Sequence, residues 1–303
     1  MDKLIGIKVD VDTYAGMRKG VPALLALFKK YNIHASFFVP MGKDHTGWTI
    51  KRVFTRKGFL KKAGRVGVVS TYGIRTLLYG LLLPGPEIAR KNADLLHKIM
   101  DEGHELGIHG HDHVYWHDHI KHLNREETWK ELRKAFTTYQ EIMKRPPQSF
   151  AAPGWMTNTH ALRFFEENNF IYTSNVRGKS PFFPEMGKES FGILEIPTTL
   201  PTLDEVVGIV GTGIISLGNF YLNTLTGGLN ILTIHTELEG KKWSHLLEML
   251  IEKTLELGFT YKRIIDIAIE LKNNKNSPVC ETVYGHIEGR AGEVCLQQTL
   301  PKT

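Results

Sequence analysis

The chain has 303 residues, a formal net charge of +6, and 42% hydrophobic against 23% charged residues. This length allows one large α/β domain or two smaller ones, and the composition excludes a disordered or fibrous protein. No apolar run approaches the roughly 20 residues that a membrane span needs, and the N-terminal pattern is not that of a secretory signal. The only cysteines, Cys280 and Cys295, are expected to be free thiols in a reducing cytoplasm.

Strand and helix patterns alternate along the chain. In the first half we expect strands at 4–10, 34–40 and 104–109 and helices at 21–31, at 87–102, and from a cap at Asn124 to before Pro146. The second half adds strands at 149–154, 170–175, 192–197 and 229–235 and helices near 157–168, 212–225, 241–257 and 261–271. About seven strand–helix repeats predict parallel pairing in a barrel-like or wound α/β domain. Residues 272–303 are polar and are expected to form an irregular C-terminal tail.

Polar residues gather where the predicted strands end. Asp10 and Asp12 follow the first strand in "VDVDT", His109 and His113 follow the third in "GIHGHDH", and His235 ends the last in "LTIHTEL". The carboxyl ends of parallel strands meet at one end of a barrel, so these side chains should lie together. Strand alternation puts Asp10 and Asp12 on one face, roughly 6.5–7 Å apart. The two histidines, four residues apart, point the same way if the chain makes one turn there.

These residue types match the hydrolysis of an amide. Asp12, His109 and His113 could hold a divalent ion (Zn, Co, Mn, Ni or Fe) that activates water. Asp10 would take a proton from the water, and His235 would give one to the departing nitrogen. The alternatives are that the two aspartates cap the adjoining turn and helix and that His235 is a buried structural residue.

Four segments, in this order and spacing, resemble motifs of the polysaccharide deacetylase family: "VDVDTYAGMRKGVPALL", "GHELGIHGHDH", "FAAPGW" and "LTIHTELEG". The match extends over about residues 3–271. The resemblance implies a distorted seven-stranded (β/α) barrel over 1–271, and metal-dependent removal of acyl groups from amino sugars. It implies the same roles for the five residues above, and it adds the backbone N–H of Gly154 as an oxyanion donor.

The sequence departs from the family at Ala151, where an arginine commonly holds the base carboxylate. We expect Arg177, in "TSNVRG", to substitute for that arginine. Trp155 is expected beside the substrate, and Asp112 is expected to orient a ligand imidazole.

Within the family, the segments "DVDTYAGMRKGVP" and "TSNVRG" are similar to a branch that removes formate from an amino-arabinose carried on undecaprenyl phosphate, in lipid A modification. The resemblance therefore implies a lipid-linked sugar as the substrate. The alternatives are a deacetylase of another N-acylated sugar or glycan and a non-catalytic module that binds membranes or carbohydrate. A two-histidine, one-carboxylate iron oxygenase fits the spacing least well.

Residues 45–86 contain eight basic residues and no acidic one. Aromatic and aliphatic residues interleave with these cations, and an apolar run from Ile74 to Leu83 would form a helix about 15 Å long, too short to cross a bilayer. We expect a basic amphipathic insertion that binds an anionic membrane, with the protein peripheral on the cytoplasmic face. The leucine run argues against nucleic acid as the partner. The expected membrane-surface residues are Trp48, Lys51, Arg52, Arg56, Lys57, Phe59, Lys61, Lys62, Arg65, Leu77, Leu78 and Leu81.

Overall fold

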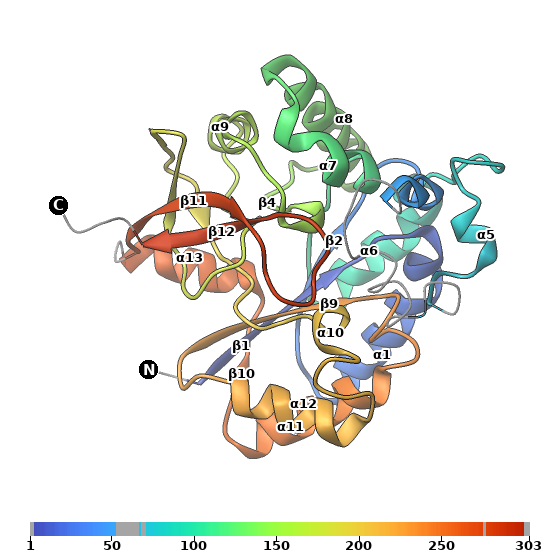
Figure 1. Cartoon of the computed structure of the whole chain (residues 1–303), viewed down its shortest axis with the longest axis vertical. Coiled ribbons are helices and arrows are strands. Elements are labelled where there is room, and N and C mark those ends of the chain that lie inside the picture. The colour runs from blue at the N-terminus through green and yellow to red at the C-terminus, as the bar shows by residue number, and fades with distance from the viewer. Residues whose placement is uncertain (1–2, 53–66, 68–70, 275–276, 300–303) are drawn as a thin grey trace.

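The computed structural model describes residues 3–52, 67, 71–274 and 277–299. Its main sheet is parallel and curves into a half-barrel (Figure 1), as the sequence predicts. Its strands are β1 (Leu4–Asp10), β2 (Ser36–Val39), β3 (Glu105–Ile108), β4 (Ser149–Ala151), β5 (Tyr172–Ser174), β8 (Leu194–Glu195), β9 (Leu229–His235) and the two-residue β10 (Thr260–Tyr261). The predicted seven-stranded barrel is confirmed, with β10 as a short addition.

Strand β1 lies at the centre of this sheet. One edge of β1 pairs with β9 along all seven β1 residues. The other edge of β1 pairs with β10 near the start of the strand and with β2 near its end. Six of the seven β1 residues are buried, as expected of a strand covered on both faces. The register places Asp10 opposite His235 on β9. The two longest strands of this sheet therefore bring their polar ends to the same place.

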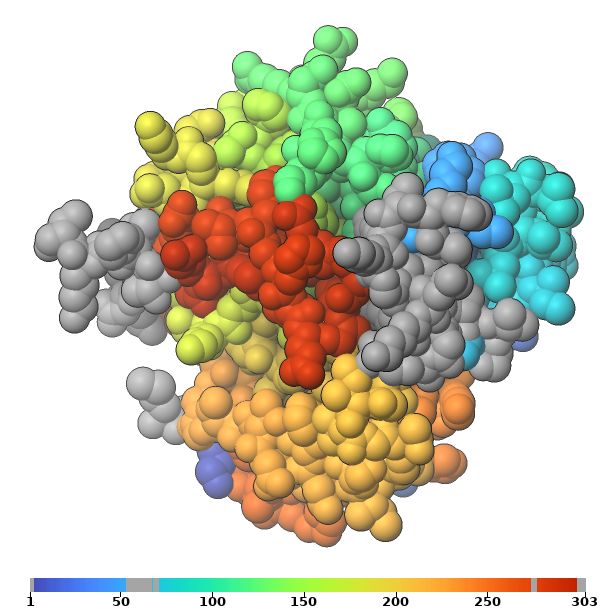
Figure 2. Space-filling view, viewed as in Figure 1, coloured from blue at the N-terminus to red at the C-terminus, as the bar shows by residue number. Residues whose placement is uncertain are grey.

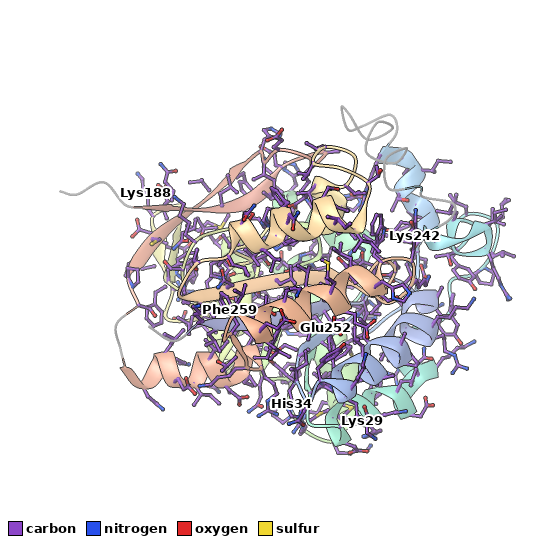
Figure 3. The ribbon with its side chains drawn as sticks, turned by 90° about the horizontal axis from the view of Figure 1, so that it is seen from below. Lys29, His34, Lys188, Lys242, Glu252 and Phe259 are labelled. Atoms are coloured by element: carbon purple, nitrogen blue, oxygen red, sulfur yellow. The ribbon has the colours of Figure 1, made fainter. Side chains whose placement is uncertain are left out.

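The longer helices cover the outside of the half-barrel (Figure 1). The α-helices among the described residues are α1 (Val21–Lys30), α5 (Ile74–Leu77), α6 (Ala93–Asp101), α7 (His113–His119), α8 (Arg125–Met143), α9 (Thr159–Glu167), α10 (Leu203–Val206), α11 (Ile214–Thr224), α12 (Ser244–Glu256) and α13 (Ile264–Asn274). The predicted cap of α8 is confirmed, since Asn124 and Glu127 form a reciprocal capping box. In Figure 3, α12 lies alongside α1, where Tyr31 donates a hydrogen bond of 2.5 Å to Glu252.

Some predicted boundaries are wrong for local reasons. The helix expected from residue 87 begins only at Ala93, because the Asn92 amide donates to the Ile88 carbonyl (2.7 Å) within a preceding 3-10 turn. The strand expected over 149–154 ends at Ala151, since Pro153 starts the short 3-10 helix η5 (Pro153–Trp155). Helix α7, which begins at His113, was not predicted as a helix.

The prediction of an irregular C-terminal tail over 272–303 is also wrong. Strands β11 (Val279–Gly285) and β12 (Val294–Thr299) form an antiparallel hairpin. This C-terminal hairpin extends a second sheet with β6 (Phe183–Met186) and β7 (Glu189–Ser190). It crosses the middle of the face shown in Figure 2, between the helices around α7 and the segments around α10. Both cysteines are buried free thiols within it.

The basic insertion is described only in part. Its described part includes helix η2 (Thr46–Lys51) and helix α5, and the helix expected over 74–83 is a single turn. Beyond α5 the chain folds back at Gly80, which has a φ of +82° and whose carbonyl accepts from the Trp48 indole. No helix among the described residues is long and apolar enough to cross a membrane. Six expected membrane-surface residues lie outside the described residues: Arg56, Lys57, Phe59, Lys61, Lys62 and Arg65.

Candidate active site

The three expected metal ligands lie together at the carboxyl end of the barrel. The Oδ1 atom of Asp12 is 3.5 Å from Nε2 of His109 and 3.3 Å from Nε2 of His113. Candidate ligand atoms of all three residues lie within 4.8 Å of one another. Asp12 comes two residues after β1, His109 directly after β3, and His113 from the first turn of α7. The turn that the His-x-x-x-His spacing required is therefore present.

The surrounding structure fixes the orientation of one imidazole. Nδ1 of His109 lies 2.8 Å from the Ala151 carbonyl, which can only accept a hydrogen bond, so Nδ1 carries the proton. Nε2 is then the ring atom that faces Oδ1 of Asp12. A backbone carbonyl behind a ligating histidine is a common way to hold that histidine in place.

The electrostatics of Asp12 also suit a cation. Burial opposes ionisation of its carboxyl, but the imidazoles of His113 and His109 outweigh burial and lower its pKa below the ordinary value. Burial lowers the pKa of His113 to about 4, so this imidazole is neutral at pH 7. Oδ1 of Asp12 is buried and has no hydrogen-bond partner in the described residues. An ionised Asp12 carboxylate with an unsatisfied oxygen, beside the neutral imidazole of His113 and the Nε2 atom of His109, fits a divalent ion.

Asp10 lies beside the triad in the same pocket and is only 3% exposed. Its partner is a cation that the sequence analysis missed: Lys8 Nζ lies 3.6 Å from Oδ2, and the Lys8 side chain is fully buried. The other oxygen, Oδ1, has no hydrogen-bond partner among the described residues. Lys8 and Asp10 are two residues apart on β1 and so share a face, a signal that strand alternation could have provided.

The prediction that Arg177 substitutes for the family arginine is therefore wrong. Arg177 instead pairs with Glu205, with Nη2 3.2 Å from Oε2. Ala151, at the family arginine's position, contributes its carbonyl to His109, and the cation beside Asp10 comes from β1. Burial lowers the pKa of Lys8, while the carboxylates of Asp10 and Glu195 oppose that shift.

His235 closes the pocket from the end of β9. Burial would lower its pKa, but the carboxylates of Asp12, Asp204 and Asp10 together raise it to about 8. The imidazole is therefore largely protonated at pH 7. Its Nδ1 atom is buried and has no partner in the described part of the chain. These properties are those of a proton donor.

Gly154 lines the pocket in a backbone conformation that only glycine adopts without strain. Its φ is +67°, and a Cβ atom would lie 2.5 Å from the His117 ring. Trp155 follows it and is held by a 3.0 Å hydrogen bond from Nε1 to Thr198 Oγ1. Both residues line the pocket that holds the triad.

Two other expected residues have more structural roles. Asp112 caps α7 by accepting from the Tyr115 N–H (2.9 Å) and pairs with Nδ1 of His45 (2.5 Å), so it positions His113 only through the helix. Trp48 stacks on His45 with ring centroids 4.0 Å apart.

Arg52, expected at the membrane surface, is 8% exposed; its Nε donates to Asp118 (2.8 Å), and its side chain lines the active-site pocket. Leu77 also lines that pocket, whereas Lys51 and Leu81 are exposed and Leu78 is half-buried.

Comparison with known proteins agrees with this geometry. Residues 2–171 match the family model described as polysaccharide deacetylase. The chain belongs to this family. Two relatives, from Shewanella sediminis and Wigglesworthia glossinidia brevipalpis, are each named probable 4-deoxy-4-formamido-L-arabinose-phosphoundecaprenol deformylase. The chain is 34% identical to the first over 98% of its own length and 95% of the relative's, and 33% identical to the second over 95% and 100%.

Solved structures of the family share the fold at low sequence identity. A probable polysaccharide deacetylase from Pseudomonas aeruginosa PAO1 superposes with a TM-score of 0.59 at 16% identity, covering 90% of this chain and 92% of that one. A family 4 acetyl xylan esterase from Clostridium thermocellum, solved in complex with a cobalt ion, gives a TM-score of 0.51 at 13% identity, covering 91% and 93%. These similarities show the polysaccharide deacetylase fold.

Proposed function

We propose that this protein is a metal-dependent deformylase that hydrolyses the formamide of an amino-arabinose carried on undecaprenyl phosphate and releases formate. The observation that carries the proposal is the pocket in which the Asp12–His109–His113 triad, Asp10 and His235 meet. The substrate follows from the relatives that match nearly the whole chain. On this proposal the protein acts in lipid A modification, on the cytoplasmic face of the membrane.

The three-residue triad would hold the ion, with zinc, cobalt, manganese, nickel and iron all compatible with this donor set. When bound, such an ion supplies Lewis acidity to the formamide oxygen and to water. Asp10 would take a proton from the attacking water, with Lys8 stabilising its negative charge. The Gly154 N–H would stabilise the oxyanion, a contribution of about 3 kcal/mol in comparable sites. His235, protonated near pH 7, would deliver a proton to the leaving nitrogen.

Exposed apolar side chains beside the pocket support a substrate with a lipid chain. Ile74, Leu81 and Leu82 are exposed around Leu77, which lines the pocket. A second exposed group, Ile209, Val210, Ile214 and Ile215, follows α10, whose Asp204 also lines the pocket. Apolar patches of this kind mark lipid or partner contacts. We propose that these two groups rest in the interface of an anionic membrane.

The decisive experiment is mass spectrometry of a polyprenyl-phosphate formamido-arabinose incubated with the protein and a divalent metal. We expect loss of the formyl mass with release of formate, and no loss when a chelator is present. The acetamido analogue serves as the competing substrate. Faster turnover of that analogue would assign the protein to deacetylation instead, and no turnover of either would favour the non-catalytic module.

The membrane part has its own test. We expect the protein to float with vesicles containing anionic lipid at low salt, and to stay in the aqueous fraction with neutral vesicles. Substituting Leu82→Ser and Ile215→Ser together should weaken flotation, because both side chains are more than 75% exposed. Equal flotation of this variant would show that neither apolar group contacts lipid.

A further inference from the structure

The C-terminal hairpin contributes an arginine to the active-site pocket. Arg290 lies in the loop between β11 and β12, and both it and the following Ala291 line the pocket with the metal-ligand triad. In Figure 1 this loop reaches from the second sheet toward α10. The side chain of Arg290 is only 7% exposed, although it belongs to a loop.

The guanidinium of Arg290 is mostly buried and incompletely paired within the described residues. In the described part of the chain its Nε has no partner, and the only carboxylate within 4 Å is Glu205, whose Oε1 is 3.7 Å from Nη1. Glu205 is already engaged, because Oε2 accepts from the Thr202 N–H (3.0 Å) and lies 3.2 Å from Nη2 of Arg177. Buried charged donors are costly to leave unsatisfied, so an acceptor from outside the chain is expected.

The position of this guanidinium is fixed by its neighbours. Its Cζ lies 4.4 Å from the ring centroid of Trp155, whose indole is itself anchored on Thr198. The preceding Gly289 has a φ of +81°, and a Cβ there would lie 2.1 Å from the carbonyl oxygen of Glu205. The loop therefore packs directly against α10. The hydrogen-bond donors of Arg290 are held in position and are not free to rotate into solvent.

We propose that Arg290 binds the phosphate group of the substrate, with Trp155 as its platform. This inference rests on the proposed function, in which the formamido sugar is joined to a polyprenyl phosphate. A guanidinium presents parallel N–H donors that match two phosphate oxygens, and such charge-assisted bonds are stronger than neutral ones. Arg52 also lines the pocket, but its Nε is paired with Asp118, which makes it the weaker candidate.

The first test compares two substrates in four variants. Arg290→Gln should raise KM for the polyprenyl-phosphate formamido sugar by about 10- to 100-fold, as expected for a lost hydrogen bond to a charged group. For the methyl glycoside of the same formamido sugar, which has no phosphate, kcat/KM should change by less than about twofold. Arg290→Lys should recover part of the phosphate-dependent affinity, because it keeps the charge but not the fork of donors.

Arg125→Gln is the matched control, since Arg125 also lies 4.4 Å from an indole centroid, that of Trp129, but is exposed and outside the pocket. The Arg125→Gln variant should keep the wild-type KM and kcat/KM for both substrates. Equal losses on the two substrates in Arg290→Gln would show a structural role and overturn the inference. An unchanged KM for the phosphate substrate would overturn it as well, as would a phosphate-specific loss in Arg52→Gln but not in Arg290→Gln.

A binding assay separates this inference from the proposed function. Farnesyl phosphate and inorganic phosphate are titrated into the metal-loaded protein and followed by ³¹P NMR. We expect farnesyl phosphate to bind at least about tenfold more tightly than inorganic phosphate, and to lose that affinity in Arg290→Gln but not in Arg125→Gln. If wild-type protein releases no formate yet shows this pattern, the deformylase proposal fails and the phosphate site stands. Equal binding of the two probes would assign the site to free phosphate and overturn the lipid-linked ligand.

Discussion

Two buried carboxylates on strands β3 and β1 of the half-barrel, Glu105 and Asp10, serve opposite purposes. Glu105, at the start of β3, accepts hydrogen bonds from Ser149 Oγ (2.5 Å), the Tyr172 hydroxyl (2.9 Å) and the Ile265 N–H (3.0 Å). Asp10, at the end of β1, has Lys8 at 3.6 Å and one oxygen with no hydrogen-bond partner in the described residues. Both are nearly inaccessible to solvent. Burial alone therefore does not distinguish a structural acid from a reactive one.

The difference lies in which groups satisfy each carboxylate. The donors to Glu105 come from three other segments of the chain and hold the amino end of the barrel together. At the carboxyl end, unpartnered buried atoms recur on Asp10, Asp12 and His235, all of which line one pocket. Unsatisfied buried polar atoms are rare in folded proteins and are concentrated where a ligand completes the set.

The largest effect is expected from removing the charge of Asp10. Asp10→Asn should lower kcat by about a thousandfold or more, because the base is lost, while metal content stays at the wild-type level. His109→Ala should lose both activity and metal, because it removes a ligand. Activity assays and metal analysis of the purified variants provide the test. Equal metal loss in both variants would mean that Asp10 is a ligand and not the base.

A smaller effect is expected when the charge of Asp10 is kept and its cation is removed. Lys8→Met should lower kcat by about 10- to 100-fold, the range for loss of a buried charged interaction, with metal content unchanged. Lys8→Arg should retain more activity than Lys8→Met, because it keeps a cation beside the carboxylate. Unchanged kcat in Lys8→Met would show that Asp10 needs no cationic partner.

The same carboxylate-to-amide change at the other end of the barrel should affect stability. Glu105→Gln replaces an acceptor oxygen with an amide that opposes the surrounding donors, and should lower the free energy of unfolding by about 2 kcal/mol. Urea unfolding measures this loss, and kcat per folded molecule should stay near the wild-type value. A variant with wild-type stability and lost activity would invalidate the contrast between the two carboxylates.

The smallest expected effect is a pH dependence at the amino end. Burial, with smaller contributions from His34 and Arg263, lowers the pKa of His104 to about 4, and its Nδ1 accepts a 3.0 Å bond from the Ala35 N–H. The unfolded chain binds this proton more readily, so stability should fall as pH drops below about 6.5. This histidine alone should account for about 1 kcal/mol between pH 6 and pH 5.

His104→Asn keeps an acceptor for the Ala35 N–H. This variant should lack the contribution of His104 to the pH dependence of the free energy of unfolding, as measured by urea unfolding. The control His97→Asn replaces an exposed histidine on α6 and should keep the wild-type slope. Identical slopes in wild type and His104→Asn would show that this imidazole does not contribute to acid sensitivity.

The sequence predicts the parallel barrel and the triad well, because both depend on local patterns. The strands at 4–10 and 229–235 are apolar, and polar residues follow them directly, so Asp10, Asp12 and His235 could be placed without knowing any long-range contact. The Asn124 cap is equally local. Lys8 was within reach of the same reasoning, since alternation alone puts it on the face of Asp10.

The rest depends on contacts between distant parts of the chain. β11 pairs with β6, which lies about a hundred residues earlier in the chain. Because so distant a pairing leaves no local pattern, the polar composition of 279–299 indicated an irregular tail. Arg290 enters the pocket only through that pairing. Arg52 was assigned to a basic surface because its ion pair with Asp118, 66 residues away, leaves no local signal.

The attachment of β12 to the catalytic end has a consequence for biosynthesis. The Arg177 N–H donates to the Cys295 carbonyl and the Arg177 carbonyl accepts from the Gln297 N–H, each at 2.9 Å. During synthesis the ribosome therefore releases the metal-ligand triad and most of the barrel well before it releases the β11–β12 loop that carries Arg290. The nascent protein could fold its half-barrel early, yet it would acquire a complete substrate pocket only after residue 297 has left the exit tunnel.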